Sequence, residues 1–218
     1  MSFSRKRVAI LISGRGSNMR SLVEAARDKH FPAEIALVLS NVASAEGLKF
    51  AQGQGIATEL VEHKAFSDRE SFERAMQARL EAHGIELVCL AGFMRVLTAW
   101  FVEQWRGKML NIHPALLPSY RGLHTHERAL ADGVKIHGAT VHFVSPEMDA
   151  GPIVVQAAVP VLDGDTAEIL AARVLAQEHR IYPLALELVT GGFTRIDGAR
   201  VHVEGREDSS AALVCPKG

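Results

Sequence analysis

Short, uninterrupted apolar runs separated by helix-forming segments are the strongest structural signal in this sequence. The runs at 8–12, 35–39 and 87–90 have the length and composition of strands that are buried on both faces of a sheet. Because helix-forming segments lie between them and the links are short, the pattern predicts parallel strands with right-handed crossovers. The expected fold is a Rossmann-like, mostly parallel open α/β sheet with helices on both faces.

The first half of the chain contains the regular part of this pattern. Strands are expected at 8–12, 35–39, 57–61, 87–90 and 109–112, and helices at 18–29, 45–52, 67–83 and 98–105. Ser67 is followed three residues later by Glu70, which is the pattern of a capping box at the start of a helix. Thr98 is the expected cap of the last of these helices.

The second half of the chain has a different character. Two longer strands, expected to be antiparallel, lie at 137–144 and 153–161, and a helix at 165–190 and a hairpin around Asp197-Gly198 follow them. Asp165 is the expected cap of the helix. Pro183 should kink or break the helix, because proline lacks a backbone N–H. The sheet is therefore expected to gain antiparallel strands in its C-terminal half.

Composition sets the domain count and excludes several classes of protein. The chain has 218 residues, of which 48% are hydrophobic, so one domain over residues 1–205 is expected, with residues 206–218 as a disordered tail. The 24 basic and 25 acidic residues nearly cancel, which argues against a nucleic-acid partner. The apolar runs are too short for a signal peptide or a membrane span, and there are only two cysteines, so we expect a cytoplasmic protein without a membrane partner.

The segment 13–18, Ser-Gly-Arg-Gly-Ser-Asn, follows a strand and precedes a helix. Ligands in such sheets bind beyond the carboxyl ends of the strands, and glycines beside a helix N-terminus let backbone amides approach an anion. The dinucleotide fingerprint is incomplete, because Met19 occupies its third glycine position and Ser40-Asn41 replaces its acidic residue. A phosphate site is favoured here, and a tight turn without a ligand remains the alternative.

Asn111 and His113 occupy positions i and i+2 at the end of an expected strand, so their side chains point to the same side. An amide beside an imidazole can stabilise an oxyanion and move a proton. The alternative is a buried, hydrogen-bonded histidine. Asp149 lies in a loop rich in glycine and proline, where it either forms a turn or reaches His113 to orient it and favour its protonated form.

The sequence gives little support for a metal site or for a serine hydrolase. Five of the ten histidines lie between His113 and His142, but their spacing matches no usual zinc pattern and no cysteine is near, so we expect no metal. The nucleophile motif G-x-S-x-G is absent.

Five separated motifs occur in one order: LISGRGSN at 11–18, LAGFMR at 90–95, NIHPALLP at 111–118, GLHTH at 122–126 and QEHRIYP at 177–183. Together they resemble the phosphoribosylglycinamide formyltransferases, the folate-dependent enzymes of purine synthesis, over essentially residues 7–190. The resemblance implies direct transfer of a formyl group from 10-formyltetrahydrofolate to the amine of glycinamide ribonucleotide. It also implies a phosphate-binding half at 1–110, a catalytic and folate-binding half at 111–205, and a monomer or homodimer.

The resemblance also assigns roles to residues. The catalytic trio would be Asn111, His113 and Asp149. The residues that bind the nucleotide would be Gly16, Ser17, Asn18 and Glu178. The folate pocket would be formed by Arg69, Met94, Arg95, Val96, Leu97, Asn111, Met148 and Asp149.

Three alternatives remain open at this stage. Methionyl-tRNA formyltransferase is disfavoured because only about 30 residues, without a basic stripe, follow the long helix. Formyltetrahydrofolate hydrolase is disfavoured because the first strand begins near residue 7, which leaves no room for a regulatory domain. A non-catalytic nucleotide-binding module would leave the trio unexplained.

Two local features of the loop after the fifth strand are also noted. Arg121 stands where many relatives have proline, and Leu117-Pro118 is a candidate cis peptide.

Overall fold

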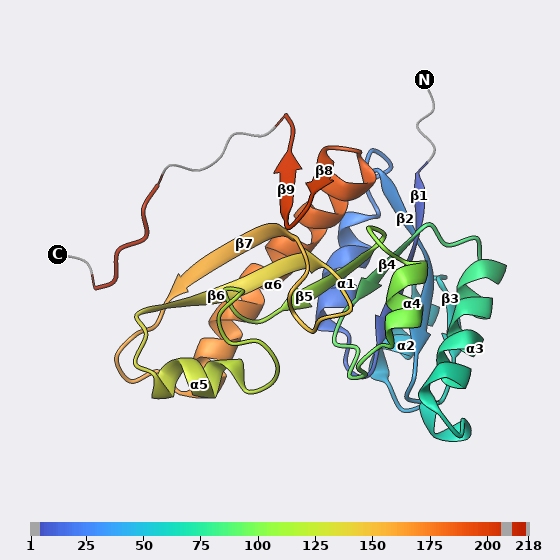
Figure 1. Cartoon of the computed structure of the whole chain (residues 1–218), viewed down its shortest axis with the longest axis horizontal. Coiled ribbons are helices and arrows are strands. Elements are labelled where there is room, and N and C mark those ends of the chain that lie inside the picture. Colours follow the sequence, from blue (N-terminus) through green and yellow to red (C-terminus); the bar gives the residue numbers. More distant parts are fainter. Residues whose placement is uncertain (1–4, 206–210, 217–218) are drawn as a thin grey trace.

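The sheet that the sequence predicts is present in the computed structural model, which describes residues 5–205 and 211–216. Seven strands lie in the order β3-β2-β1-β4-β5-β6-β7 (Figure 1). Their bounds are β1 Lys6–Ile12, β2 Ala33–Ser40, β3 Ala57–Leu60, β4 Leu87–Leu90, β5 Met109–His113, β6 Ile136–Phe143 and β7 Ile153–Pro160. The first five strands pair in parallel, while β6 and β7 add to the β5 edge in antiparallel fashion. The Rossmann-like fold with antiparallel additions is confirmed.

Helices cover both faces of the sheet, and β1 shows why. Alternate side chains of a strand point to opposite faces, so Val8, Ile10 and Ile12 pack into one core while Ala9 and Leu11 pack into the other, all fully buried. The first core lies under α1 (Ser17–Ala25), α2 (Glu46–Gly53) and α6 (Ala167–Thr190), and the second under α3 (Arg69–Ala82) and α4 (Ala99–Gln104).

Three local elements complete the described chain. A 3-10 turn at His63–Ala65 and α5 (Thr125–Ala131) were not expected from the sequence. The hairpin of β8 (Thr194–Asp197) and β9 (Arg200–Val203) was expected, and the two strands pair with each other outside the main sheet (Figure 1). Helix α5 carries few sequence signals because it has only seven residues and its N-cap, His124, makes no capping hydrogen bond with its side chain.

Two expected helix caps are wrong by one residue. Asp68, not Ser67, caps α3, because its Oδ1 accepts the Ser71 N–H at 2.7 Å. Thr166, not Asp165, caps α6, because the Asp165 carboxylate is held instead by a bidentate pair with Arg173, at 2.5 and 2.8 Å. Thr98 caps α4 as expected.

Helix α6 does not break at Pro183 but runs through it to Thr190. Tyr182, Ala185 and Leu186, which flank the proline, are all fully buried in the core beneath the sheet. Their packing outweighs the lost backbone hydrogen bond, as tertiary contacts commonly outweigh local preference. Across residues 5–205 and 211–216, no helix has the length and apolar character that crossing a membrane requires.

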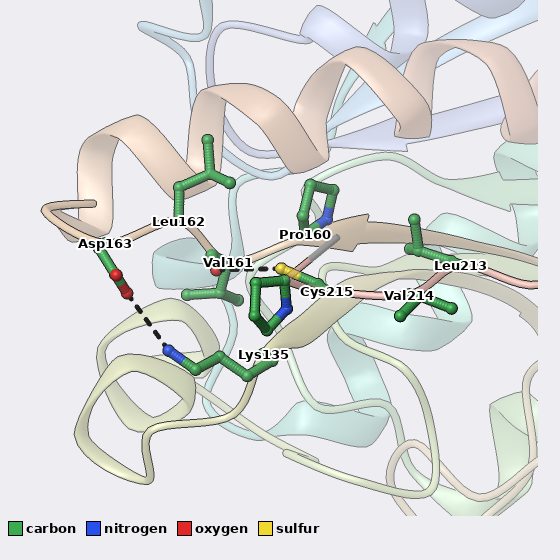
Figure 2. Close-up of a pocket in the computed structure, with 9 residues that line it drawn as sticks. Lys135, Pro160, Val161, Leu162, Asp163, Leu213, Val214 and Cys215 are labelled. Carbon is green, nitrogen blue, oxygen red and sulfur yellow. Dashed lines mark hydrogen bonds and ion pairs between the residues drawn. The ribbon is translucent and has the colours of Figure 1, made fainter. Parts of the chain in front are cut away.

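Part of the expected tail is described. Residues 206–210 and 217–218 of the expected disordered tail lie outside the described residues. Residues 211–216 run beside the end of β7, where the Cys215 Sγ lies 3.8 Å from the Val161 carbonyl oxygen (Figure 2). The cavity between them, about 330 Å³, contains none of the candidate site residues.

Candidate active site

The loop after β1 presents free backbone amides to a hollow. Gly16 adopts a left-handed conformation, with φ +71°, and α1 begins at the next residue. The first hydrogen bond of the helix runs from Arg20 N–H to the Gly16 carbonyl at 3.0 Å, so the amides of residues 17–19 have no partner within the helix. The first turn carries no acidic residue. This is the geometry of an anion site at a helix N-terminus.

The hollow beside these amides has a volume of about 280 Å³ and is lined by residues 13–18, 91, 92 and 94. Asn18 Nδ2 donates to Glu178 Oε2 at 2.6 Å, which brings α1 and α6 together at this point. Burial raises the pKa of the Glu178 carboxyl above its ordinary value. The structure therefore brings together the four residues that were expected to bind the nucleotide.

Ser13 connects this loop to the loop after β4. Its Oγ accepts the Met94 N–H at 2.8 Å and donates to Asn41 Oδ1 at 2.6 Å. The loop at 13–18 and the loop at 92–97 that follows β4 are thus joined by one hydroxyl. Ser13 lies in the segment that the sequence marked as a ligand site, but its two hydrogen bonds to other loops were not expected.

The expected catalytic trio converges. Asn111 and His113 lie on β5, and His113 Nδ1 lies 3.5 Å from Asp149 Oδ2. The other ring nitrogen, Nε2, lies 2.9 Å from the Tyr120 carbonyl oxygen. His113 is only 5% exposed, and both of its nitrogens face acceptors, an arrangement that a doubly protonated ring satisfies.

Asp149 lies beside His113 although the strand before it, β6, ends far from His113. The chain leaves β6 beside Met109, at the opposite end of β5 from His113, with Val144 N–H donating to the Met109 carbonyl at 2.8 Å. Asp149 then takes a left-handed conformation, with φ +52°, and its Oδ2 accepts the Gly122 N–H at 2.8 Å. The carboxylate therefore fixes the loop that follows β5 as well as facing His113.

Non-glycine residues with a left-handed backbone conformation lie on the loops next to the trio. Among residues 5–205 and 211–216, the non-glycine residues with positive φ are Tyr120 at +56°, His124 at +58° and Asp149 at +52°. All three lie on the two loops that flank His113. Such conformations cost free energy and persist where the surroundings enforce them, often at functional sites. The Leu117–Pro118 peptide, left open by the sequence, is cis.

Most of the expected folate residues outside the trio lie on the loops that follow β4 and β6. Met94, Val96 and Met148 are large apolar side chains that are more than half exposed, on the loops after β4 and β6, and Leu123 on the loop after β5 is exposed as well. Arg95 is also exposed, and Leu97 is half-buried.

Arg69 is the one expected folate residue on a helix, α3. It is exposed at the start of α3, and among the residues that the structure describes no hydrogen bond or ion pair joins it to the loop after β4. One turn later, the fully buried Glu73 accepts the Thr98 N–H at 2.8 Å and also bonds the Thr98 hydroxyl. Glu73, which the sequence did not single out, thus ties α3 to the end of this loop.

Two further features of the site were missed. His142 lies inside the trio, with its Nε2 3.2 Å from Asn111 Nδ2. Arg121, noted only as a departure from the usual proline, pairs with Glu147 at 2.5 Å. That exposed ion pair joins the loop after β5 to the loop that carries Asp149. Such exposed pairs add little to stability, so this pair matters more for the relative position of the two loops than for the free energy of unfolding.

Two of the three other histidines between His113 and His142 pack against each other. The rings of His126 and His137 meet edge to face with centroids 5.3 Å apart. Burial lowers the pKa of His137 to about 4, so this ring is neutral at pH 7. In the described part of the chain, no group of three or more histidine, cysteine or acidic side chains is arranged to hold a metal ion.

Comparison with known proteins gives a consistent result. Residues 6–186 match the family model described as formyl transferase. The chain is 42% identical over 205 residues to "Phosphoribosylglycinamide formyltransferase" of Escherichia coli (strain K12), covering 91% of this chain and 97% of that one. The crystal structure of a phosphoribosylglycinamide formyltransferase from Brucella melitensis has 53% identity and a TM-score of 0.83, covering 87% of this chain and 97% of that chain.

Longer relatives also match. "Trifunctional purine biosynthetic protein adenosine-3" of Homo sapiens is 49% identical over 197 residues, covering 89% of this chain. The chain spans a fifth or less of the length of these trifunctional relatives, 20% in the human case.

Proposed function

This chain belongs to the formyl transferase family, and from that premise we propose that it transfers the formyl group of 10-formyltetrahydrofolate to the amine of glycinamide ribonucleotide. The product is N-formylglycinamide ribonucleotide, an intermediate of purine synthesis. The observation that carries the proposal is the convergence of Asn111, His113 and Asp149 at the carboxyl end of β5, close in the sheet to the amides of the loop after β1.

The nucleotide binds through its phosphate and ribose. The phosphate accepts hydrogen bonds from the free amides at the start of α1, in the loop that Gly16, Ser17 and Asn18 form. Glu178, held by Asn18 at 2.6 Å, faces the ribose or the glycinamide portion. In this proposal the nucleotide lies between α1 and α6, with its amine directed towards β5.

The folate donor occupies the apolar surface of the neighbouring loops. Met94, Arg95, Val96 and Leu97 form one wall of its pocket, and Met148 stands on the loop opposite. Arg69 is assigned here by resemblance alone. In this arrangement the phosphate-binding half, 1–110, and the catalytic half, 111–205, each contribute to both substrates.

The chemistry is direct acyl transfer. The glycinamide nitrogen attacks the formyl carbon, the carbonyl oxygen becomes an oxyanion, and the bond from that carbon to the folate nitrogen then breaks. The Asn111 amide and the positive charge of protonated His113 stabilise the oxyanion. Asp149 holds the His113 ring and relays the proton that leaves the amine towards the departing folate nitrogen.

An acceptor competition tests the proposal. The protein is incubated with 10-formyltetrahydrofolate and glycinamide ribonucleotide, with tRNA, or with buffer alone, and loss of the formyl group is followed. Rapid loss only with glycinamide ribonucleotide is expected. Equal loss in buffer would identify a hydrolase, loss that requires tRNA would identify the tRNA-directed activity, and no loss in any arm would leave a binding module.

A further inference from the structure

His142 is buried between two members of the trio, and neither the motifs nor the proposed mechanism gives it a task. The antiparallel register of β6 places His142 opposite Asn111. The side chain is 2% exposed. Its Nε2 lies 3.2 Å from Asn111 Nδ2 and 3.9 Å from Asp149 Oδ1. One ring nitrogen thus faces both the amide and the carboxylate.

The other ring nitrogen determines the proton positions. His142 Nδ1 lies 2.9 Å from the Phe143 carbonyl oxygen, which can only accept, so Nδ1 carries a proton. Burial lowers the pKa of His142 below its ordinary value, which favours a neutral ring. In a neutral ring protonated on Nδ1, Nε2 is an acceptor. Asn111 Nδ2 therefore donates to it.

This bond decides which way the Asn111 amide faces. An asparagine amide has donors on its nitrogen and an acceptor on its oxygen, and turning it by about 180° exchanges the two ends. With one Nδ2–H held by His142, the nitrogen stays on the His142 side and the second Nδ2–H remains available. A flipped amide would present its oxygen to the reaction centre and repel the developing oxyanion.

We propose that His142 is a positioning residue that holds the Asn111 amide with its nitrogen towards the formyl oxygen. The inference rests on the proposed function and adds to it the residue that orients the oxyanion donor. His142 touches neither substrate and acts through Asn111. Two ionisable groups face its ring, Asp149 from the loop after β6 and His113 from β5, and they act on its charge in opposite directions.

A double-mutant cycle tests this role. His142→Phe keeps a flat buried ring but removes the acceptor. We expect kcat to fall by ~10-fold to ~10²-fold, where the upper value is the cost of losing one oxyanion donor. The KM of both substrates should stay within about threefold of the wild-type value. In an Asn111→Ala background the same change should lower kcat by less than about threefold, since the residue through which it acts is gone. His142→Gln, whose side-chain oxygen can accept, should recover most of the lost kcat.

Equal losses of kcat in both backgrounds, or no loss at all, would overturn the proposal. A ¹⁵N NMR spectrum of the histidine rings in the wild-type protein gives an independent readout, should His142→Phe fail to fold. An unprotonated His142 Nε2 is expected, and a protonated Nε2 would overturn the proposal. Because this spectrum needs no substrate, it separates failure of this inference from failure of the proposed formyl transfer, which would appear as an inactive wild-type protein.

Discussion

At the scale of single residues, the site depends on polar groups that are held by hydrogen bonds and ion pairs to their neighbours. His113 lies between the Tyr120 carbonyl and the Asp149 carboxylate, and Asn111 is bonded to His142. Groups held in this way need little reorganisation during a reaction, which is the main source of electrostatic stabilisation in enzymes. Their contribution should therefore appear in turnover and much less in stability.

Truncation of the oxyanion donors tests this expectation. Asn111→Ala and His113→Ala should each lower kcat by ~10² to 10³ while the protein still folds. Steady-state kinetics with glycinamide ribonucleotide and a thermal melt of each variant provide the measurements. His202→Ala, on exposed β9, is the matched histidine control and should retain full activity. Turnover close to wild type in either trio variant would remove that residue from the mechanism.

Sequence reasoning at this scale succeeded where strand geometry alone was enough. Asn111 and His113 were placed on one side of a strand by their spacing of two residues, and the structure agrees. The contact between Asp149 and His113 was one of two possibilities that the sequence allowed, because it depends on how a loop turns after β6. His142 was counted among possible metal ligands, and its pairing with Asn111 follows from an antiparallel register that the sequence did not specify.

At the scale of elements, the start of α6 contains two adjacent residues with separate tasks. Thr166 accepts the Ile169 N–H at its hydroxyl, while Asp165 accepts from Arg173. From sequence, either residue could serve as the cap. The choice depends on Arg173, which lies further along the helix, so it is decided by side-chain pairing and not by local preference.

The cap at Thr166 predicts a measurable loss of stability. Thr166→Ala should lower the free energy of unfolding by about 1 kcal/mol, since one N-terminal amide of α6 loses its acceptor. Urea denaturation measures the change. Thr166→Ser keeps the hydroxyl and should remain within a few tenths of a kcal/mol of wild type. An unchanged midpoint in Thr166→Ala would show that the hydroxyl does not act as a cap.

The Asp165–Arg173 pair predicts a dependence of stability on pH. The hydrogen bonds from Arg173 lower the pKa of Asp165 from 3.8 to about 2. A carboxyl with a lowered folded-state pKa stabilises the protein above its unfolded pKa, and this contribution is lost as pH falls through the folded value. Asp165→Asn should therefore lower the Tm at pH 7, and the difference from wild type should shrink from about pH 4 towards pH 2. A difference that stays constant with pH would contradict this assignment.

At the scale of the whole molecule, the phosphate-binding loop and the catalytic trio both lie at the carboxyl ends of the parallel strands. The parallel strands β1 and β4 end beside the loops at 13–18 and 92–97, and β5 ends beside the trio. The strand pattern predicted this arrangement because parallel strands share an end. The helix α5 and the return of the Asp149 loop could not be predicted, since they depend on long-range contacts made after the sheet has formed.

Nucleotide binding should stabilise the whole fold. Glycinamide ribonucleotide at 100 times its Kd is expected to add about 2.7 kcal/mol to the free energy of unfolding, because it binds only the folded chain. A thermal shift assay checks this. Gly16→Val should abolish the shift, since Gly16 has φ +71° and an added Cβ would lie 2.9 Å from the Met19 methyl group. An undiminished shift in Gly16→Val would place the phosphate elsewhere.

The most direct test of the account is a crystal structure of the protein with glycinamide ribonucleotide and a non-reactive folate analogue. The account predicts that the phosphate accepts hydrogen bonds from the amides at the start of α1, while the carbonyl of the analogue lies within hydrogen-bonding distance of Asn111 Nδ2. A phosphate bound away from Gly16, or a carbonyl out of reach of Asn111 and His113, would contradict the proposed site.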